Sequence, residues 1–105
     1  MSYHLVLTTI PTLKKARRLA ALLLEKKLAA CVSISSPLES HYWWNQKKER
    51  GKEFFLFIKT KAVAFEKLEK VIRENHPYSV PEILAIPIQK GNPAYLAWIA
   101  KAVRV

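Results

Sequence analysis

The chain is poor in the residues that interrupt or cross-link a fold. Its 105 residues include two glycines, six scattered prolines and one cysteine, and no low-complexity tract or internal repeat occurs. This composition predicts one ordered domain over residues 1–105, without a linker. A single cysteine cannot form an internal disulfide, which fits a reducing cytoplasm.

Long apolar runs are also missing. A transmembrane helix needs about 20 consecutive apolar residues, and no run in the chain approaches that length. The first residues, Met1 to Val6, enter an alternating strand pattern and show no basic region followed by a cleavage site. The sequence therefore predicts a mature cytoplasmic chain with no membrane partner.

The motifs of common enzymes are absent as well. There is no Ser/His/Asp arrangement, no glycine-rich phosphate loop and no motif-spaced pair of carboxylates. The nearest enzymatic alternative is an acylphosphatase-like protein, which would need an arginine in an anion-cradling loop after the first strand. Residues 8–12, Thr-Thr-Ile-Pro-Thr, contain neither glycine nor arginine. We therefore expect no catalytic residues and no enzymatic activity.

Positive charge, in contrast, is abundant. Lysine and arginine number 18 against 8 aspartate and glutamate, a formal charge of +10, and they gather in residues 14–27 and 47–52. Charge of this size attracts polyanions without selecting among them. The favoured interpretation is therefore solvated basic faces with non-specific polyanion binding.

Hydrophobic periodicity predicts strands that alternate with helices. The predicted strands are residues 3–9, 29–35, 40–44, 53–60 and 83–88, and the predicted helices are residues 13–28, 62–75 and 93–103. Residues 45–52 are predicted to form the polar turn of a long hairpin. With strand 40–44 counted as part of the hairpin arm, the order β-α-β-β-α-β followed by a helix indicates an α+β fold of the ferredoxin-like, split βαβ type.

The strands of the predicted hairpin carry more apolar side chains than one buried face of a sheet can accommodate. Tyr42, Trp43 and Trp44 are consecutive, so they must point to both faces of a strand, and residues 54–58 are apolar throughout. An exposed apolar face usually marks an interface. The sequence therefore predicts a homo-oligomer joined through its sheets, with the hairpin as a connecting arm.

The most distinctive segment begins His76-Pro77-Tyr78-Ser-Val-Pro81-Glu82. Its two prolines fix the backbone angle φ and remove two donors, so the loop is stiff. That stiffness is expected to hold His76 and Tyr78 near Glu82. An imidazole, a phenol and a carboxylate in one loop make this the best candidate site.

Several motifs occur in register along nearly the whole chain. They read Leu-Ala-Ala-Cys-Val-Ser-Ile at 28–34, Ser-His-Tyr-Trp-Trp at 40–44, His-Pro-Tyr-Ser-Val-Pro-Glu-Ile at 76–83 and Tyr-Leu-Ala-Trp-Ile at 95–99, with Glu53, Lys59 and Thr60 between them. Together they resemble the CutA divalent-ion tolerance proteins. The resemblance implies a tight, cytoplasmic homotrimer, similar in shape to the PII signalling proteins and associated with tolerance of divalent metals, copper above all.

The resemblance also implies a cleft between subunits. Lys59, His76, Tyr78 and Glu82 would line it and could hold a small anion or metabolite. The alternative is that Lys59 and Glu82 pair only to close the interface, and the sequence leaves both interpretations open.

Two positions depart from the family pattern. Gln46 replaces the usual glycine of the hairpin turn, which predicts a differently shaped tip. Asn75 replaces a second histidine that some members carry before the His-Pro-Tyr motif, which weakens any copper site built from neighbouring histidines.

Candidate metal ligands follow from copper chemistry. Copper(I) favours thiolate and copper(II) favours imidazole, so Cys31 and His76 come first, followed by His41 and His4. None of the four has a ligand spacing in the sequence, so a site would have to be assembled by folding or across subunits. Structural roles are favoured: a small buried side chain for Cys31, a hydrogen bond within the loop for His76 and an interface contact for His41.

A second class of function is a single-stranded RNA-binding module, because the RRM shares this topology and the chain is basic. Residues 53–58 have the aromatics of such a module but not its glycines. The two-sided apolarity of that strand favours burial over RNA contact.

Overall fold

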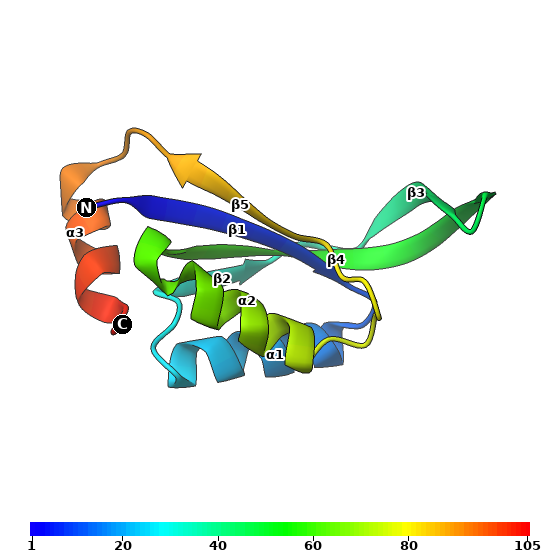
Figure 1. Cartoon of the computed structure of the whole chain (residues 1–105), viewed down its shortest axis with the longest axis horizontal. Helices are drawn as coiled ribbons and strands as arrows, with labels where there is room; N and C mark the ends of the chain where they lie inside the picture. The colour runs from blue at the N-terminus through cyan, green and yellow to red at the C-terminus, as the bar shows by residue number, and fades with distance from the viewer.

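The computed structural model describes residues 1–105 and shows an antiparallel five-stranded sheet with two helices packed beneath one face (Figure 1). The strands are β1 (Tyr3–Ile10), β2 (Cys31–Ile34), β3 (Leu38–Trp44), β4 (Lys47–Lys61) and β5 (Ile83–Ile88). The helices are α1 (Leu13–Glu25), α2 (Phe65–Glu74) and α3 (Pro93–Ala102), with a 3₁₀ turn η1 (Ala62–Ala64) before α2. The α+β class predicted from the sequence is confirmed.

The strand order is β2-β4-β1-β5, and β3 pairs with the far part of β4. All the pairings are antiparallel, and Val6 of β1 lies between Ile58 of β4 and Ala85 of β5. The two strands that flank β1 are therefore far from it in sequence, as in the split βαβ arrangement.

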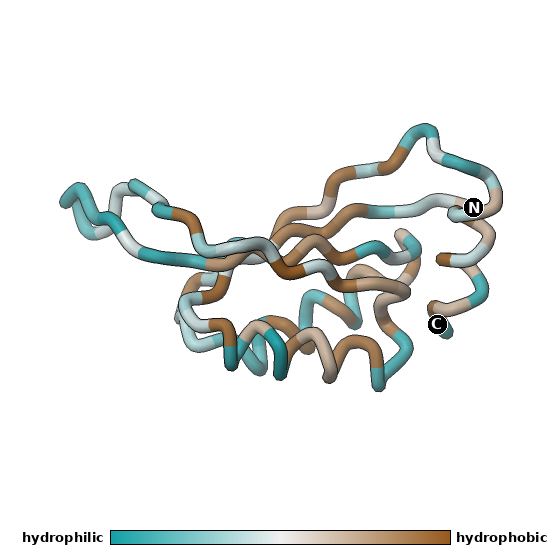
Figure 2. The backbone as a smooth tube through the Cα atoms, turned by 180° about the vertical axis from the view of Figure 1, so that it is seen from behind, coloured by the Kyte–Doolittle hydropathy of each residue, from teal (hydrophilic) through white to brown (hydrophobic).

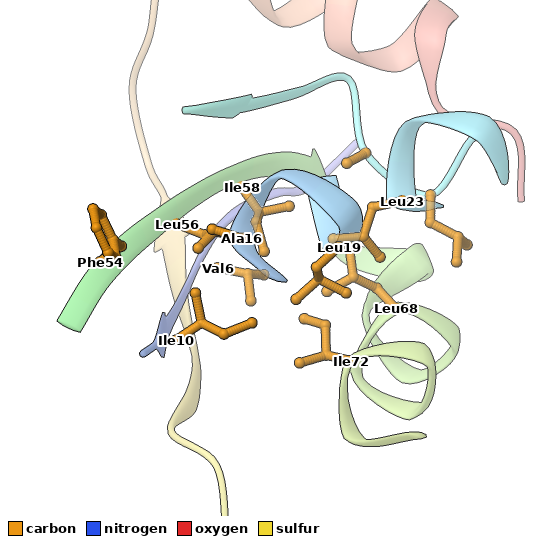
Figure 3. Close-up of a cluster of buried hydrophobic side chains, with 12 residues drawn as sticks. Val6, Ile10, Ala16, Leu19, Leu23, Phe54, Leu56, Ile58, Leu68 and Ile72 are labelled. Carbon is orange, nitrogen blue, oxygen red and sulfur yellow. The ribbon is translucent and has the colours of Figure 1, made fainter. Parts of the chain in front are cut away.

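The core lies between the sheet and the helices α1 and α2. Val6, Leu56 and Ile58 point down from the sheet and meet Leu19 of α1 and Leu68 of α2 (Figure 3). These five side chains are at most 2% exposed. Burying each contributes about 1.5 to 3 kcal/mol, so this layer fixes the sheet on the helices.

The other face of the sheet has no helix over it. Leu84 and Ile86 of β5 are 53% and 46% exposed, and Phe55 packs against Phe57 on β4 with ring centroids 5.7 Å apart. Alternation explains this arrangement, because the odd-numbered residues of β4 point away from the helical layer. No helix of the structure is both long enough and apolar enough to span a membrane.

The hairpin of β3 and β4 differs from the prediction. Residues 45–52 are not a polar turn: the turn is Asn45 and Gln46 alone, and β4 begins at Lys47. Both turn residues have positive φ, 50° and 65°, as a two-residue hairpin with the favoured twist requires. The arm, residues 38–53, therefore projects as a long two-stranded ribbon with a hydrophilic tip (Figure 2).

Helix α1 is also shorter than predicted. It begins where Thr12 accepts a hydrogen bond from the Lys15 backbone N–H at 3.2 Å, and it ends at Glu25 rather than residue 28. Lys27 has a φ of 59°, a left-handed conformation that stops an α-helix. Leu28 is buried beyond that stop and belongs to the core.

Candidate functional site

A cleft of about 700 Å³ opens where the arm leaves the core. We call it the arm–loop cleft, because the loop of residues 76–82 forms one wall and the base of the arm forms the other. Its lining includes His41, Tyr42 and Trp44 from β3, Glu53 from β4, and Tyr78 and Glu82 from the loop. It is the size of pockets that enclose small ligands, roughly 300 to 1,000 Å³.

His76 holds the loop against the sheet. Its Nε2 lies 2.7 Å from the carbonyl oxygen of Thr9, and the backbone N–H of Tyr78 donates to its Nδ1 at 3.1 Å. Because Nδ1 accepts, Nε2 carries the hydrogen and donates to Thr9, so the ring is neutral. Burial lowers the pKa of His76, against the opposing effects of the Thr9 hydrogen bond and the Glu53 charge. Both ring nitrogens have protein partners, so this imidazole offers a metal no free lone pair.

Tyr78 closes the loop onto β4. Its hydroxyl group donates a 2.8 Å hydrogen bond to Oε2 of Glu53, which is only 9% exposed. Burial raises the pKa of Tyr78, and the neighbouring Glu53 carboxylate raises it further. The phenol therefore stays protonated and keeps donating across the physiological pH range.

Glu53 lines the cleft but was not among the candidate site residues predicted from the sequence, although it belongs to the motif pattern. It pairs with Leu38 at the start of the arm, immediately before Phe54, which pairs with Ile10 in the core sheet. The signal in the sequence was a lone carboxylate directly preceding an entirely apolar strand. From the sequence alone, a carboxylate at this position is interpreted as the solvent-exposed end of a strand. Only the structure shows that the loop of residues 76–82 covers it.

Glu82 provides a second carboxylate to the same cleft. Burial raises its pKa, and repulsion from Glu53 adds to the shift. Two carboxylates at one opening attract a cation, because a positive charge between them relieves their mutual repulsion.

Lys59 does not line this cleft. On the open face of the sheet, its Nζ donates to Ser33 Oγ at 2.7 Å and to Cys31 Sγ at 3.6 Å. Burial raises the pKa of Tyr95, and the neighbouring Cys31 adds to the shift, so α3 borders this cluster. No ion pair joins Lys59 to Glu82 within the chain. Glu69 and Arg73 form an ion pair, and Glu39 Oε2 lies 2.8 Å from the Nε2 atom of His41.

The four metal-ligand candidates therefore do not come together within one chain. His4, on β1, lies edge-on to the ring of Phe65 with centroids 6.3 Å apart. His76 is in the loop, Cys31 is on the open sheet face, and His41 lines the cleft with its Nε2 2.8 Å from Glu39 Oε2. No group of three or more histidine, cysteine or acidic side chains is close enough to hold a metal ion. One chain alone does not supply a complete copper site.

The fold and the cleft define a class: small α+β proteins with a split βαβ sheet, an uncovered sheet face and a projecting hairpin. Residues 4–102 match the family model described as CutA1 divalent ion tolerance protein. The chain belongs to this CutA1 family.

Individual relatives agree with the family match. The divalent-cation tolerance protein CutA of Thermus thermophilus is 44% identical over 96 residues, covering 91% of this chain and 93% of the relative. A solved structure of a Thermus thermophilus divalent cation tolerance protein superposes with a TM-score of 0.95 at 41% identity, over 97% of this chain and 99% of the other. The chloroplastic protein CutA 1 of rice is 40% identical over 94% of this chain, which spans only 56% of that relative. The comparisons give no support to the RNA-binding alternative.

Proposed function

We propose that this protein acts in tolerance of divalent metal ions, copper first among them, as a homotrimer that binds a metal ion or a small ligand at the arm–loop cleft. The observation that carries the proposal is the pairing of Glu53 with Tyr78 opposite Glu82, two carboxylates at one opening. Membership of the CutA1 family supplies the link to divalent cations.

The support for a trimer is the sheet face that α1 and α2 leave uncovered. Leu84, Ile86 and Trp98 are each 46% or more exposed, on β5 and on the neighbouring α3. Exposed apolar surface of this kind is covered in stable oligomers. A neighbouring subunit placed there would also bring further side chains toward the cleft, which one chain leaves without a full set of metal ligands.

Isothermal titration calorimetry with Cu²⁺ tests the cleft. We expect the double variant Glu53→Gln and Glu82→Gln to lose measurable binding, because amides remove the negative charge that attracts the cation. The matched control is Glu66→Gln with Glu74→Gln, which removes two exposed carboxylates from α2, away from the cleft. Equal binding by wild type and the cleft variant would contradict the proposal.

Location in the cytoplasm is part of the same proposal. Its support is the single cysteine, partly buried and unpaired, which needs no oxidising compartment. Fractionation of cells that express the full chain tests it, and recovery outside the cytoplasm would contradict it.

A further inference from the structure

A second cavity lies on the helical side of the loop. Its volume is about 200 Å³, and it is formed by Lys15 and Arg18 of α1 with Asn75, His76 and Pro77 after α2. We call it the α1–α2 pocket. It shares Pro77 with the arm–loop cleft but none of that cleft's carboxylates.

The charge of this pocket is one-sided. Lys15 and Arg18 lie three residues apart on one helical face, and no acidic residue lines the cavity. Neither Lys15 nor Arg18 lies within ion-pair distance of a carboxylate. The carboxylates that have such partners are Glu39, beside His41, and Glu69, beside Arg73. The remaining ionisable group, His76, is held neutral by its two hydrogen bonds.

The start of α1 concentrates positive charge further. A helix N-terminus carries a partial positive charge and normally attracts acidic side chains. The first turn of α1 has no acidic residue and holds Lys14 and Lys15 instead. The fold gains no stability from this arrangement, since like charges repel, but an anion bound in the pocket would be attracted by the helix terminus and by Lys15 beside it.

Asn75 adds a neutral donor. One hydrogen of its Nδ2 is given to the Val71 carbonyl oxygen at 2.8 Å, and the other has no partner in the chain. An arginine fork, a lysine point charge and an amide donor are together a set that suits the oxygens of a phosphate group.

We propose that the α1–α2 pocket binds a phosphate group, as free inorganic phosphate or as the phosphate monoester of a small molecule, through Lys15, Arg18 and Asn75. The volume supports a group of this size, because it lies below the roughly 300 to 1,000 Å³ of pockets that enclose whole drug-sized ligands. Arg18 binds two phosphate oxygens in this arrangement, and Lys15 neutralises the remaining charge.

The test is a titration of the full ¹⁵N-labelled chain with sodium phosphate, followed by amide chemical shifts, against sodium chloride at matched ionic strength. We expect saturating shifts at Lys15, Arg18 and Asn75 with phosphate and none with chloride. Shifts that rise linearly without saturating, or that are equal with chloride, would indicate non-specific attraction of anions to the basic helix α1 and would overturn the proposal.

The helix offers a closely matched pair of variants. Lys15→Gln with Arg18→Gln removes the pocket cations, whereas Lys14→Gln with Arg17→Gln removes the same residue types at the same spacing from positions outside the pocket. We expect the first double variant to lose the phosphate shifts and the second to keep them. Equal loss in both would overturn the proposal.

A conservative variant covers the case in which the double variant folds poorly. Arg18→Lys keeps the charge but removes the fork, and we expect about tenfold weaker phosphate binding. Unchanged affinity would show that no bidentate contact exists. Vesicles of phosphatidylcholine with phosphatidic acid form a separate arm: binding to them without saturable binding of free phosphate would replace the small-molecule site with a membrane surface.

Discussion

The Tyr78 hydroxyl group and Glu53 Oε2 are 2.8 Å apart, although the two residues lie on different elements 25 positions apart in the chain. This hydrogen bond joins the proline-stiffened loop to the base of the arm. Both residues line the arm–loop cleft, so removing this hydrogen bond tests how much the contact between the loop and the arm contributes to stability.

Replacing Tyr78 by phenylalanine should lower the free energy of unfolding by about 1 kcal/mol, the usual net value of a protein hydrogen bond. Urea unfolding at one fixed protein concentration measures the change, since assembly makes stability concentration-dependent. Tyr42→Phe is the control, because this exposed tyrosine of the arm donates no hydrogen bond. An equal loss of stability in both variants would show that the effect of Tyr78→Phe does not come from its hydrogen bond to Glu53.

The neutral state of His76 should make stability depend on pH. Burial lowers its pKa below the ordinary value of 6.5, so between the folded and unfolded pKa values the unfolded chain binds more protons at this ring. The contribution of neutral His76 to the free energy of unfolding is therefore complete above about pH 6.5. It is lost as the pH falls through the pKa of this histidine in the folded protein. Glu82 acts in the opposite direction, because its raised pKa adds stability as the pH falls toward 4.5.

The variant His76→Gln isolates the histidine contribution from that of Glu82. Urea midpoints at about pH 7.5 and pH 5.5 should differ less in this variant than in the wild type. An identical pH difference in wild type and His76→Gln would show that the ring does not change its protonation on folding.

Gln46→Gly should stabilise the arm. Gln46 has a φ of 65°, and a left-handed conformation costs roughly 1 to 2 kcal/mol in residues other than glycine. Glycine removes that strain but adds about 0.5 to 1 kcal/mol of unfolded-state entropy, so we expect a net gain of about 0.5 to 1 kcal/mol. Thermal unfolding measures it, and Gln46→Ala should show no gain because alanine keeps the strain.

Two arginines on the open sheet face should prevent assembly. We expect light scattering of the wild type in high salt to give three times the 12.1 kDa chain mass. Leu84→Arg with Ile86→Arg should give the mass of one chain, because the interface would bury two unpaired charges. Val63→Arg is the control, since this side chain is 68% exposed on η1 in the helical layer. A wild-type mass of one chain would contradict the proposed trimer.

Hydrophobic periodicity was sufficient to predict the position of the helices and strands that bury one face. β5 has the predicted bounds, and α2 occupies most of residues 62–75, because their apolar positions repeat every two or about 3.6 residues. The first part of β4 was missed for the opposite reason. In the arm, the residues from Lys47 to Gly51 contact no core, so their polarity carries no strand signal.

The site was partly predictable. The loop was identified from its prolines, and the structure brings Tyr78 and Glu82 to one cleft with His76 as the anchor behind them. The partners of these residues come from other strands, Thr9 from β1 and Glu53 from β4. A pattern in the sequence reports the period of one element and not the register between elements. It therefore could not show that, within one chain, the Lys59 ammonium group binds Ser33 on the open sheet face.

The register of β4 gives the arm a further property. β4 is one unbroken strand of 15 residues, and it passes from its pairing with β1 at Phe54 to its pairing with β3 at Glu53 without a hinge. The arm and the core sheet therefore share one backbone at Glu53, the residue whose carboxylate faces the cleft. With no flexible joint between them, the direction in which the arm projects is fixed by the same strand that positions this carboxylate.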